Sequence, residues 1–148
     1  GALCRPFDPE GLMMARKLLL VLGLAVCTAS PVAAQDMASF RSPSGNIGCM
    51  YLDGFLRCDV AEVSNRQPRP PADCEFGWGQ AFEMERGSRR AARICHGDTV
   101  LDPGAPVLRY GASWEGGGFS CLSSERGISC RNARGAGWDL SRRAQTVH

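Results

Sequence analysis

The chain has 148 residues, and its 17 Lys and Arg against 15 Asp and Glu leave a net charge of +2. This balance gives no basis for a nucleic-acid partner or for electrostatic binding to a membrane surface. The length suits a single domain, and eight cysteines in so short a chain make its redox compartment the first question.

Residues 13–34 have the three-part pattern of a secretory signal peptide. Arg16 and Lys17 precede an apolar run at residues 18–26, and small residues supply a cleavage site after Ala34. We therefore expect a mature protein of residues 35–148 that is secreted or periplasmic and has no membrane span after cleavage.

Two other interpretations of this segment are weaker. The apolar run has nine residues, whereas a membrane-spanning helix needs roughly 20. A lipoprotein signal ending at Cys27 requires a small residue before the cysteine, and Val26 fits that poorly. Residues 1–12, which include Cys4, carry no pattern and are interpreted as a non-native extension upstream of the start.

The first predicted element of the mature chain is a β-hairpin between Cys49 and Cys58. Asp53-Gly54 lies at its middle and is a strong two-residue turn signal, since both positions need positive φ. That turn places the two cysteines opposite each other at a non-hydrogen-bonded pair, where the Cα separation suits a disulfide.

The alternation of the two strands predicts one apolar face and one mixed face. The apolar face comprises Ile47, Cys49, Tyr51, Leu56, Cys58 and Val60. The mixed face comprises Gly48, Arg57 and Asp59, with Met50, Leu52 and Phe55 toward the tip.

Further elements follow in short segments separated by Gly and Pro. Three prolines make residues 65–72 an extended loop. Residues 79–85 alternate as a strand, residues 91–95 read as its returning partner, and residues 100–101 and 107–110 are short strand candidates.

The last third of the chain predicts a second hairpin after a flexible break at residues 116–118. Cys121 and Cys130 have the same spacing as the first pair, and they oppose each other if residues 124–127 form a four-residue loop with Gly127 in the left-handed conformation. Residues 138–140 alternate and predict a final strand.

Six cysteines in the mature segment of an exported chain indicate three disulfides. The two hairpins account for four of them, so Cys74 and Cys95 pair by elimination. Zinc is the alternative, but no Cys-x-x-Cys or Cys/His spacing occurs. The sequence thus predicts a small all-β domain at residues 35–148, an antiparallel sandwich or barrel cross-linked by disulfides.

Several segments of the chain resemble a family of small exported bacterial proteins that is catalogued as a domain of unknown function. The first block is Ser42-Pro43-Ser44-Gly45-Asn46-Ile47-Gly48-Cys49, followed by Arg57-Cys58-Asp59-Val60. The later blocks are Pro71-Ala72-Asp73-Cys74, Cys95-His96-Gly97-Asp98-Thr99-Val100-Leu101, Leu108-Arg109-Tyr110-Gly111, Gly127-Ile128-Ser129-Cys130-Arg131-Asn132 and Ser141-Arg142. The resemblance implies export and a single domain, and it supplies no activity.

The chain departs from the family pattern near its C-terminus. Family members often read Gly-His-Gly-Phe where this chain reads Gly135-Ala136-Gly137-Trp138. A role for that histidine cannot operate here, and the departure suggests that the segment serves packing, with Trp138 in the aromatic position.

Few residues are candidates for catalysis. His96 is the only histidine inside the predicted domain apart from the terminal His148, and acidic pairs occur as Glu83 with Glu85 and as Asp73 with Glu75. No nicotinamide, flavin, haem or phosphate-loop signature is present, so we assign no catalytic, cofactor or metal residues and expect no cofactor.

The leading hypothesis is a non-catalytic binding or structural module that contacts an unknown extracytoplasmic protein or envelope component. The alternatives are a small hydrolase that uses His96 with an acidic partner, and an inhibitor of a wall-degrading enzyme, the latter by architectural analogy alone. Candidate contact residues are Trp114, Met50, Leu52 and Phe55, unless a second sheet packs on them. Two arginine clusters, at residues 89–93 and 131–143, are interpreted as solvated faces.

Overall fold

The computed structural model describes residues 36–148, which form ten β-strands and no helix. The predicted signal peptide and the extension at residues 1–12 lie outside the described residues. The strands are β1 (Met37–Arg41), β2 (Ile47–Leu52), β3 (Phe55–Val60), β4 (Gly77–Glu85), β5 (Ala92–His96), β6 (Ser113–Gly116), β7 (Phe119–Ser124), β8 (Gly127–Asn132), β9 (Gly137–Leu140) and β10 (Gln145–Val147).

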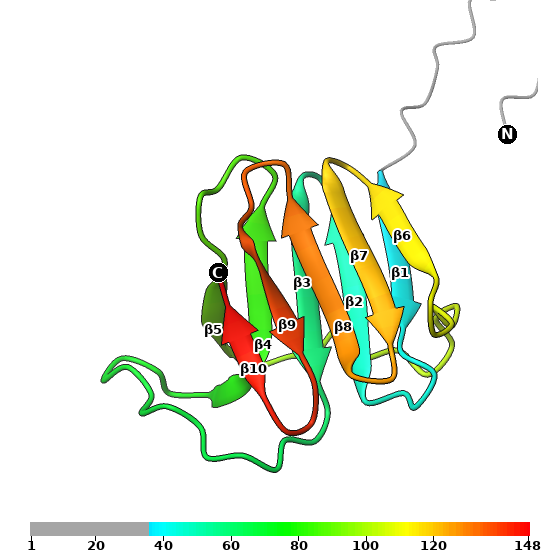
Figure 1. The fold of residues 1–148 in the computed structure, drawn as a ribbon. Coiled ribbons are helices and arrows are strands. Elements are labelled where there is room, and N and C mark those ends of the chain that lie inside the picture. The colour runs from blue at the N-terminus through cyan, green and yellow to red at the C-terminus, as the bar shows by residue number, and fades with distance from the viewer. Residues whose placement is uncertain (1–35) are drawn as a thin grey trace, which may run out of the picture. The chain divides into compact units, whose positions relative to one another are not determined.

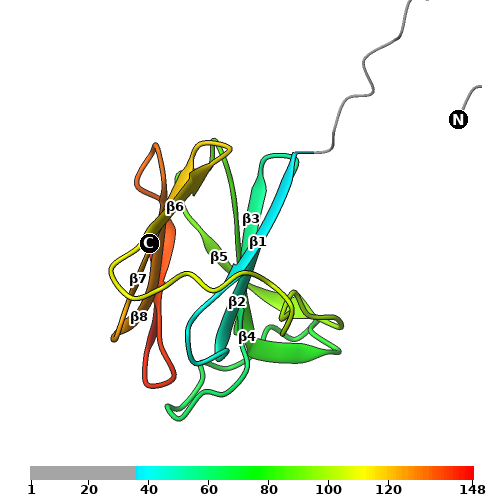
Figure 2. The same cartoon turned by 90° about the vertical axis from the view of Figure 1, so that its right-hand side faces the viewer.

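The strands make two antiparallel sheets that face each other (Figures 1 and 2). Sheet A has the order β1-β2-β3-β4-β5 and sheet B the order β10-β9-β8-β7-β6, so each sheet is a meander of consecutive strands. The chain completes sheet A before it begins sheet B. The predicted antiparallel all-β fold is confirmed, and the architecture is a sandwich.

The first hairpin has the predicted turn, register and faces. Asp53 and Gly54 have φ of 46° and 88°, and the turn pairs Cys49 with Cys58, which are joined by a disulfide. All six residues predicted for the apolar face are at most 3% exposed. The local turn chemistry therefore determines which side chains this hairpin buries.

The second hairpin has the predicted pairing but a shorter loop. Cys121 opposes Cys130 and is bonded to it. Ser124 and Gly127 pair with each other, so only two residues form the turn. Gly127 has φ of 124°, and a Cβ there would overlap the carbonyl oxygen of Leu140 on β9. The glycine is thus required by the approach of a neighbouring strand as well as by its own conformation.

The third disulfide joins Cys74, in the long loop between β3 and β4, to Cys95 on β5. This confirms the pairing predicted by elimination. Cys95 is exposed and Cys74 half-buried, so this bridge lies at the surface.

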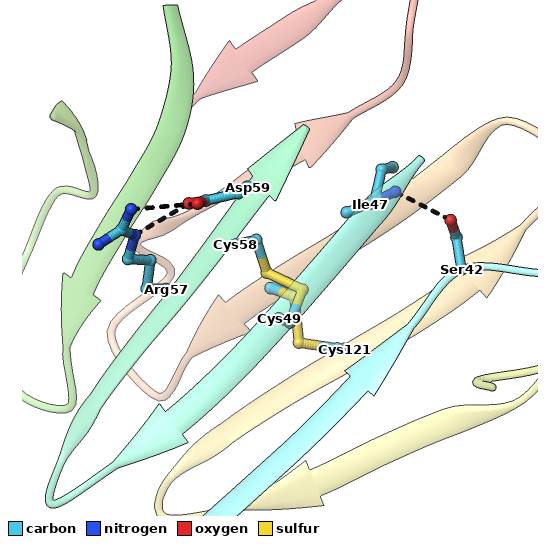
Figure 3. Close-up of a disulfide and its surroundings, with 8 residues drawn as sticks. Ser42, Ile47, Cys49, Arg57, Cys58, Asp59 and Cys121 are labelled. Carbon is cyan, nitrogen blue, oxygen red and sulfur yellow. Dashed lines mark hydrogen bonds and ion pairs between the residues drawn. A yellow bond between two sulfur atoms is a disulfide. The ribbon is translucent and has the colours of Figure 1, made fainter. Parts of the chain in front are cut away.

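The other two disulfides lie in the core between the sheets. The sulfur atoms of Cys49, Cys58 and Cys130 lie within 4.8 Å of one another, so the bridge of one hairpin packs on the bridge of the other. Figure 3 shows Cys121 of sheet B beside the Cys49–Cys58 bridge of sheet A. Trp138, which is fully buried, packs on Phe82 with ring centroids 6.4 Å apart, as its predicted packing role requires.

Strand assignments between the hairpins are partly wrong. Residues 100–101 form no strand, because Val100 N donates to the Asp59 carboxylate and Leu101 N donates to the Thr99 hydroxyl. Residues 107–110 form none either, and Val107 makes only an isolated parallel bridge with Arg41.

Three short strands, β1, β6 and β10, are absent from the sequence-based prediction. The triple glycine is not a flexible break, because Gly116 pairs with Phe119 and the intervening Gly117 and Gly118 form a two-residue turn with φ of 58° and 89°. A Cβ on Gly117 would overlap the Tyr51 ring, so this turn packs directly on sheet A.

Candidate functional site

A network of polar side chains lies on the outer face of sheet A and is centred on the buried carboxylate of Asp59. This carboxylate is 2% exposed and accepts hydrogen bonds from Arg57 Nε at 2.9 Å and Nη2 at 3.0 Å (Figure 3). It also accepts from the Thr99 hydroxyl at 2.9 Å and from Val100 N at 3.0 Å. The sequence places Asp59 on the mixed outer face, but does not reveal that residues 98–101 cover it.

Arg57 completes this group through Asp98, whose carboxylate it contacts at 2.8 Å. Burial opposes the charge of Arg57, but the hydrogen bonds that it donates to the carboxylates of Asp59 and Asp98 raise its pKa above the usual value. A hydrogen bond from Arg57 lowers the pKa of Asp98. Each charged group of this network has a partner of opposite charge, and four hydrogen-bond donors surround the Asp59 carboxylate. The network therefore attaches residues 98–101 to sheet A.

His96, the candidate for hydrolysis, lies beside this network without joining a carboxylate. Its Nδ1 lies 2.8 Å from the backbone carbonyl oxygen of Asp98, and the Asp98 carboxylate is engaged by Arg57. His96 Nε2 is buried and has no hydrogen-bond partner among residues 36–148. The described part of the chain therefore brings no acidic side chain into hydrogen-bond contact with His96.

Within residues 36–148, neither of the two acidic pairs noted in the sequence forms a hydrogen bond or ion pair with His96. Glu83 is half-buried opposite Arg57 in the β3–β4 register, and Glu85 is exposed at the end of β4. Asp73 and Glu75 are exposed on either side of Cys74.

The clustered sulfur atoms in the core resemble a metal site only in their spacing. Each of Cys49, Cys58 and Cys130 belongs to a disulfide. Metals bind the thiolate, which these oxidised residues do not provide.

Of the candidate contact residues, those at the hairpin tip lie on an outer face, whereas Trp114 packs between the sheets. Phe55 is 45% exposed, and Met50 and Leu52 are half-buried on the outer face of sheet A, opposite the face that packs on sheet B. Trp114 is half-buried and packs on Phe40 and Tyr51, with ring centroids 5.2 and 5.9 Å away. It packs against the core, which is the alternative that the sequence left open for this residue.

A cleft with a volume of about 970 Å³ lies where turns of both sheets come together. Sheet A contributes the β1–β2 turn and the residues after β3, and sheet B contributes the β7–β8 and β9–β10 turns. Tyr110, from the connection between the sheets, also lines it. The lining residues are Ser42, Ser44, Gly45, Asn46, Ile47, Ala61, Glu62, Tyr110, Ser124, Glu125, Arg126, Gly127, Ser141, Arg142 and Arg143.

One wall of the cleft is held rigid by side chains that bind the backbone. The Ser42 hydroxyl accepts from Ile47 N at 3.0 Å (Figure 3). Asn46 Nδ2 donates to the Glu62 carbonyl at 3.1 Å, and Glu62 N donates back to Asn46 Oδ1 at 2.9 Å. The polar residues of the first resemblance block thus brace two loops of sheet A against each other.

The opposite wall carries side chains that are free to meet a ligand. Tyr110 is 51% exposed, and among residues 36–148 neither its hydroxyl nor the side chains of Glu125, Arg126 and Arg143 form a hydrogen bond or ion pair. Arg142 pairs with Glu62 across the cleft. The site thus offers two unpaired guanidinium groups, one carboxylate and a flat aromatic ring.

Sequence reasoning missed this site. The arginines at 142 and 143 are treated there as a solvated face, and Tyr110 as part of a strand. No local signal could have found the cleft, because its residues come from five separate segments.

The model of a family of unknown function, DUF6636, matches residues 18–148. The chain belongs to this family. No curated protein and no solved structure matches it.

Membership in DUF6636 agrees with the resemblance to a family of unknown function and brings no activity with it. Among residues 36–148, no helix has the length and apolar character needed to cross a membrane.

Proposed function

We propose that this DUF6636 protein is a non-catalytic extracytoplasmic binding module and that the cleft around Tyr110 is its ligand site. Three disulfides support a location outside the cytosol, because such bonds persist in oxidising compartments. The two-sheet scaffold serves to hold the turns that form the cleft.

The observation that carries the proposal is the convergence of separate segments on one cleft. Four of the blocks that resemble the family contribute lining residues: 42–47, 110, 127 and 141–142. These blocks are far apart in sequence. Packing accounts for the glycine at 127, but it gives no reason for an exposed tyrosine and two unpaired arginines at the same place.

The chemistry of the free groups indicates the class of ligand. Arg126 and Arg143 can each bind an oxyanion through paired N–H donors, and the exposed ring of Tyr110 offers a flat face for an apolar surface. A chain of acidic sugars presents both features, a carboxylate beside the apolar face of a ring. We therefore assign an acidic polysaccharide of the cell envelope as the ligand.

The proposal is tested by co-sedimentation of the oxidised mature protein with isolated envelope material. The wild type should sediment with it, and Tyr110→Ala and the double variant Arg126→Gln/Arg143→Gln should stay in solution. Arg89→Gln/Arg90→Gln is the matched control, because it removes the same charge from the exposed β4–β5 turn. Equal sedimentation of all four proteins would exclude the cleft as the binding site.

The proposal that the protein is not an enzyme is tested separately. Wild type and His96→Ala are incubated with the bound polysaccharide, and the release of reducing ends is measured. We expect none from either protein. Release by the wild type that His96→Ala lacks would show a hydrolase instead.

A further inference from the structure

A second pocket, with a volume of about 940 Å³, lies between the long β3–β4 loop and the β5/β10 side of the sandwich. It shares no lining residue with the cleft around Tyr110. Its walls include Pro68, Pro70 and Trp78, and three arginines line it, Arg66, Arg69 and Arg93. No acidic residue is among its lining residues.

Arg93 is the unusual member of this group. It is half-buried on β5, stacks over the Phe82 ring with its Cζ 4.9 Å from the centroid, and forms no ion pair within residues 36–148. Burial is the cause of a pKa below the usual arginine value. A charge that is partly removed from water without a counter-ion is costly, and a bound anion would offset that cost.

The hydrogen bonds of Arg93 leave part of its guanidinium free. Nη1 donates to Gln67 Oε1 at 2.6 Å and to the Gly79 carbonyl at 2.9 Å, and Nη2 donates to the Gln145 carbonyl at 3.3 Å. Its Nε and the second Nη2 hydrogen have no partner within the described residues. All of these acceptors are neutral, so they orient the group without neutralising it.

The pocket is rigid before any ligand arrives. Trp78 Nε1 donates to the Pro68 carbonyl at 3.0 Å, which fixes the indole against the loop. Gln67 Nε2 donates to Gln145 Oε1 at 3.0 Å, and Ser64 N donates to the Arg142 carbonyl at 2.8 Å, so the loop is attached to sheet B. Such preorganisation lowers the cost of binding.

We propose that this pocket binds an oxyanion carried on a ring, with the oxyanion between Arg93 and the rim residues Arg66 and Arg69 and the ring against Trp78. Arg66 and Arg69 are exposed, and their side chains form no hydrogen bond or ion pair within residues 36–148. They can therefore turn toward an anion held at Arg93. The ligand class is a sulfated, phosphorylated or carboxylated ring compound.

Trp78 provides the fluorescence signal, because Trp138 is buried in the core, Trp114 packs against the core, and neither of them lines this pocket. The oxidised mature protein is titrated with inorganic sulfate and with phenyl phosphate, against sodium chloride at equal ionic strength, while tryptophan emission is recorded. Both oxyanions should change the emission and chloride should not. Phenyl phosphate should bind about tenfold more tightly than sulfate, because only it has a ring to stack on Trp78.

Three variants distinguish binding at a specific site from nonspecific electrostatic attraction. Trp78→Phe should lose the emission change, and Arg66→Gln/Arg69→Gln should weaken binding about tenfold or more while keeping the Arg93 network. Arg89→Gln/Arg90→Gln should bind as the wild type does. A response to chloride equal to that to sulfate, or the same affinity in the Arg66→Gln/Arg69→Gln variant, would overturn the proposal. Because this pocket and the Tyr110 cleft have no lining residue in common, neither result bears on the other site.

Discussion

Asn132, the last residue of β8 in sheet B, donates from Nδ2 to the carbonyl oxygen of Glu85, the last residue of β4 in sheet A, at 3.1 Å. The same amide nitrogen donates to the Ser88 carbonyl at 2.7 Å. Its Oδ1 accepts from Arg134 N at 2.9 Å and from Ala136 N at 3.0 Å. One buried side chain thus satisfies four backbone groups and joins the two sheets.

Replacing Asn132 with Ala should lower the free energy of unfolding by about 2–3 kcal/mol, because buried backbone groups lose their partners. Asn132→Asp keeps the acceptor but faces two carbonyl oxygens with a carboxylate, and it should be at least as harmful. Urea denaturation measures both, with Ser120→Ala on the exposed face of β7 as the control. A cost no larger than that of the control would show that this contact between the sheets is dispensable.

The buried carboxylate of Asp59 and the exposed carboxylate of Asp98 share Arg57 as partner but differ in environment. Asp59→Ala leaves Arg57 and the backbone of the covering segment without their main acceptor and should cost about 3 kcal/mol. Asp98 is 81% exposed, so Asp98→Ala should change stability little. Guanidinium denaturation compares the two variants, and equal losses would contradict a structural role specific to Asp59.

The environment of Asp139 indicates that the free energy of unfolding depends on pH. Burial opposes its ionisation, but hydrogen bonds from Ser129, His148 and Arg131 outweigh burial and lower its pKa from 3.8 to about 2. A lowered pKa in the folded state means that the stabilisation is present above pH 3.8 and is lost as the pH falls toward 2. Because the side chain is 46% exposed, solvent screening reduces the contribution to about 1 kcal/mol.

The check is the difference in unfolding free energy between wild type and Asp139→Asn, measured by urea titration at several pH values. That difference should be largest at about pH 5 and should shrink as the pH approaches about 2. A difference that stays constant over this range would mean that Asp139 contributes no charge-dependent stability.

The disulfides should differ in their accessibility to reductant. Cys49, Cys58, Cys121 and Cys130 are at most 1% exposed, whereas Cys95 is exposed. Thiol–disulfide exchange requires access to a sulfur atom, so mild reduction of the folded protein should open Cys74–Cys95 first. The order is read by alkylation and peptide mass spectrometry.

Loss of the two core bridges should accompany unfolding, since each disulfide contributes about 3 kcal/mol by loop entropy. A reduced protein with an unchanged thermal melt would contradict this account, as would early alkylation of the core cysteines.

The sequence predicted those parts of the fold that local chemistry determines. The Asp53-Gly54 turn and the nine-residue separation of each hairpin pair specify register without knowledge of the rest of the chain. β10 was missed because three residues show no useful alternation. Residues 100–101 were misassigned because their amides bind side chains, which hydrophobic pattern cannot reveal.

The candidate site could not be predicted for a different reason. Tyr110 lies beside the β7–β8 turn because Gly111 and Ala112 hydrogen-bond to Ser123, but the β1–β2 turn faces them across the cleft only after the two sheets pack, and no segment specifies that packing by itself. Burial of Asp59 is likewise a long-range effect, since its cover comes from residues about forty positions later in the chain. Local sequence patterns predict the individual strands and turns, but they do not predict which of these elements lie next to one another in the folded protein.

The most direct test is a binding isotherm of residues 35–148, with all three disulfides formed, measured with a purified acidic polysaccharide, polygalacturonate, and with neutral dextran. We expect saturable binding to polygalacturonate alone, weakened about tenfold or more by Arg126→Gln/Arg143→Gln and by Tyr110→Ala, and unchanged by Arg89→Gln/Arg90→Gln. Equal affinity for the charged and neutral polymers, or for the wild type and the cleft variants, would contradict the assignment of the Tyr110 cleft as an acidic-polysaccharide site.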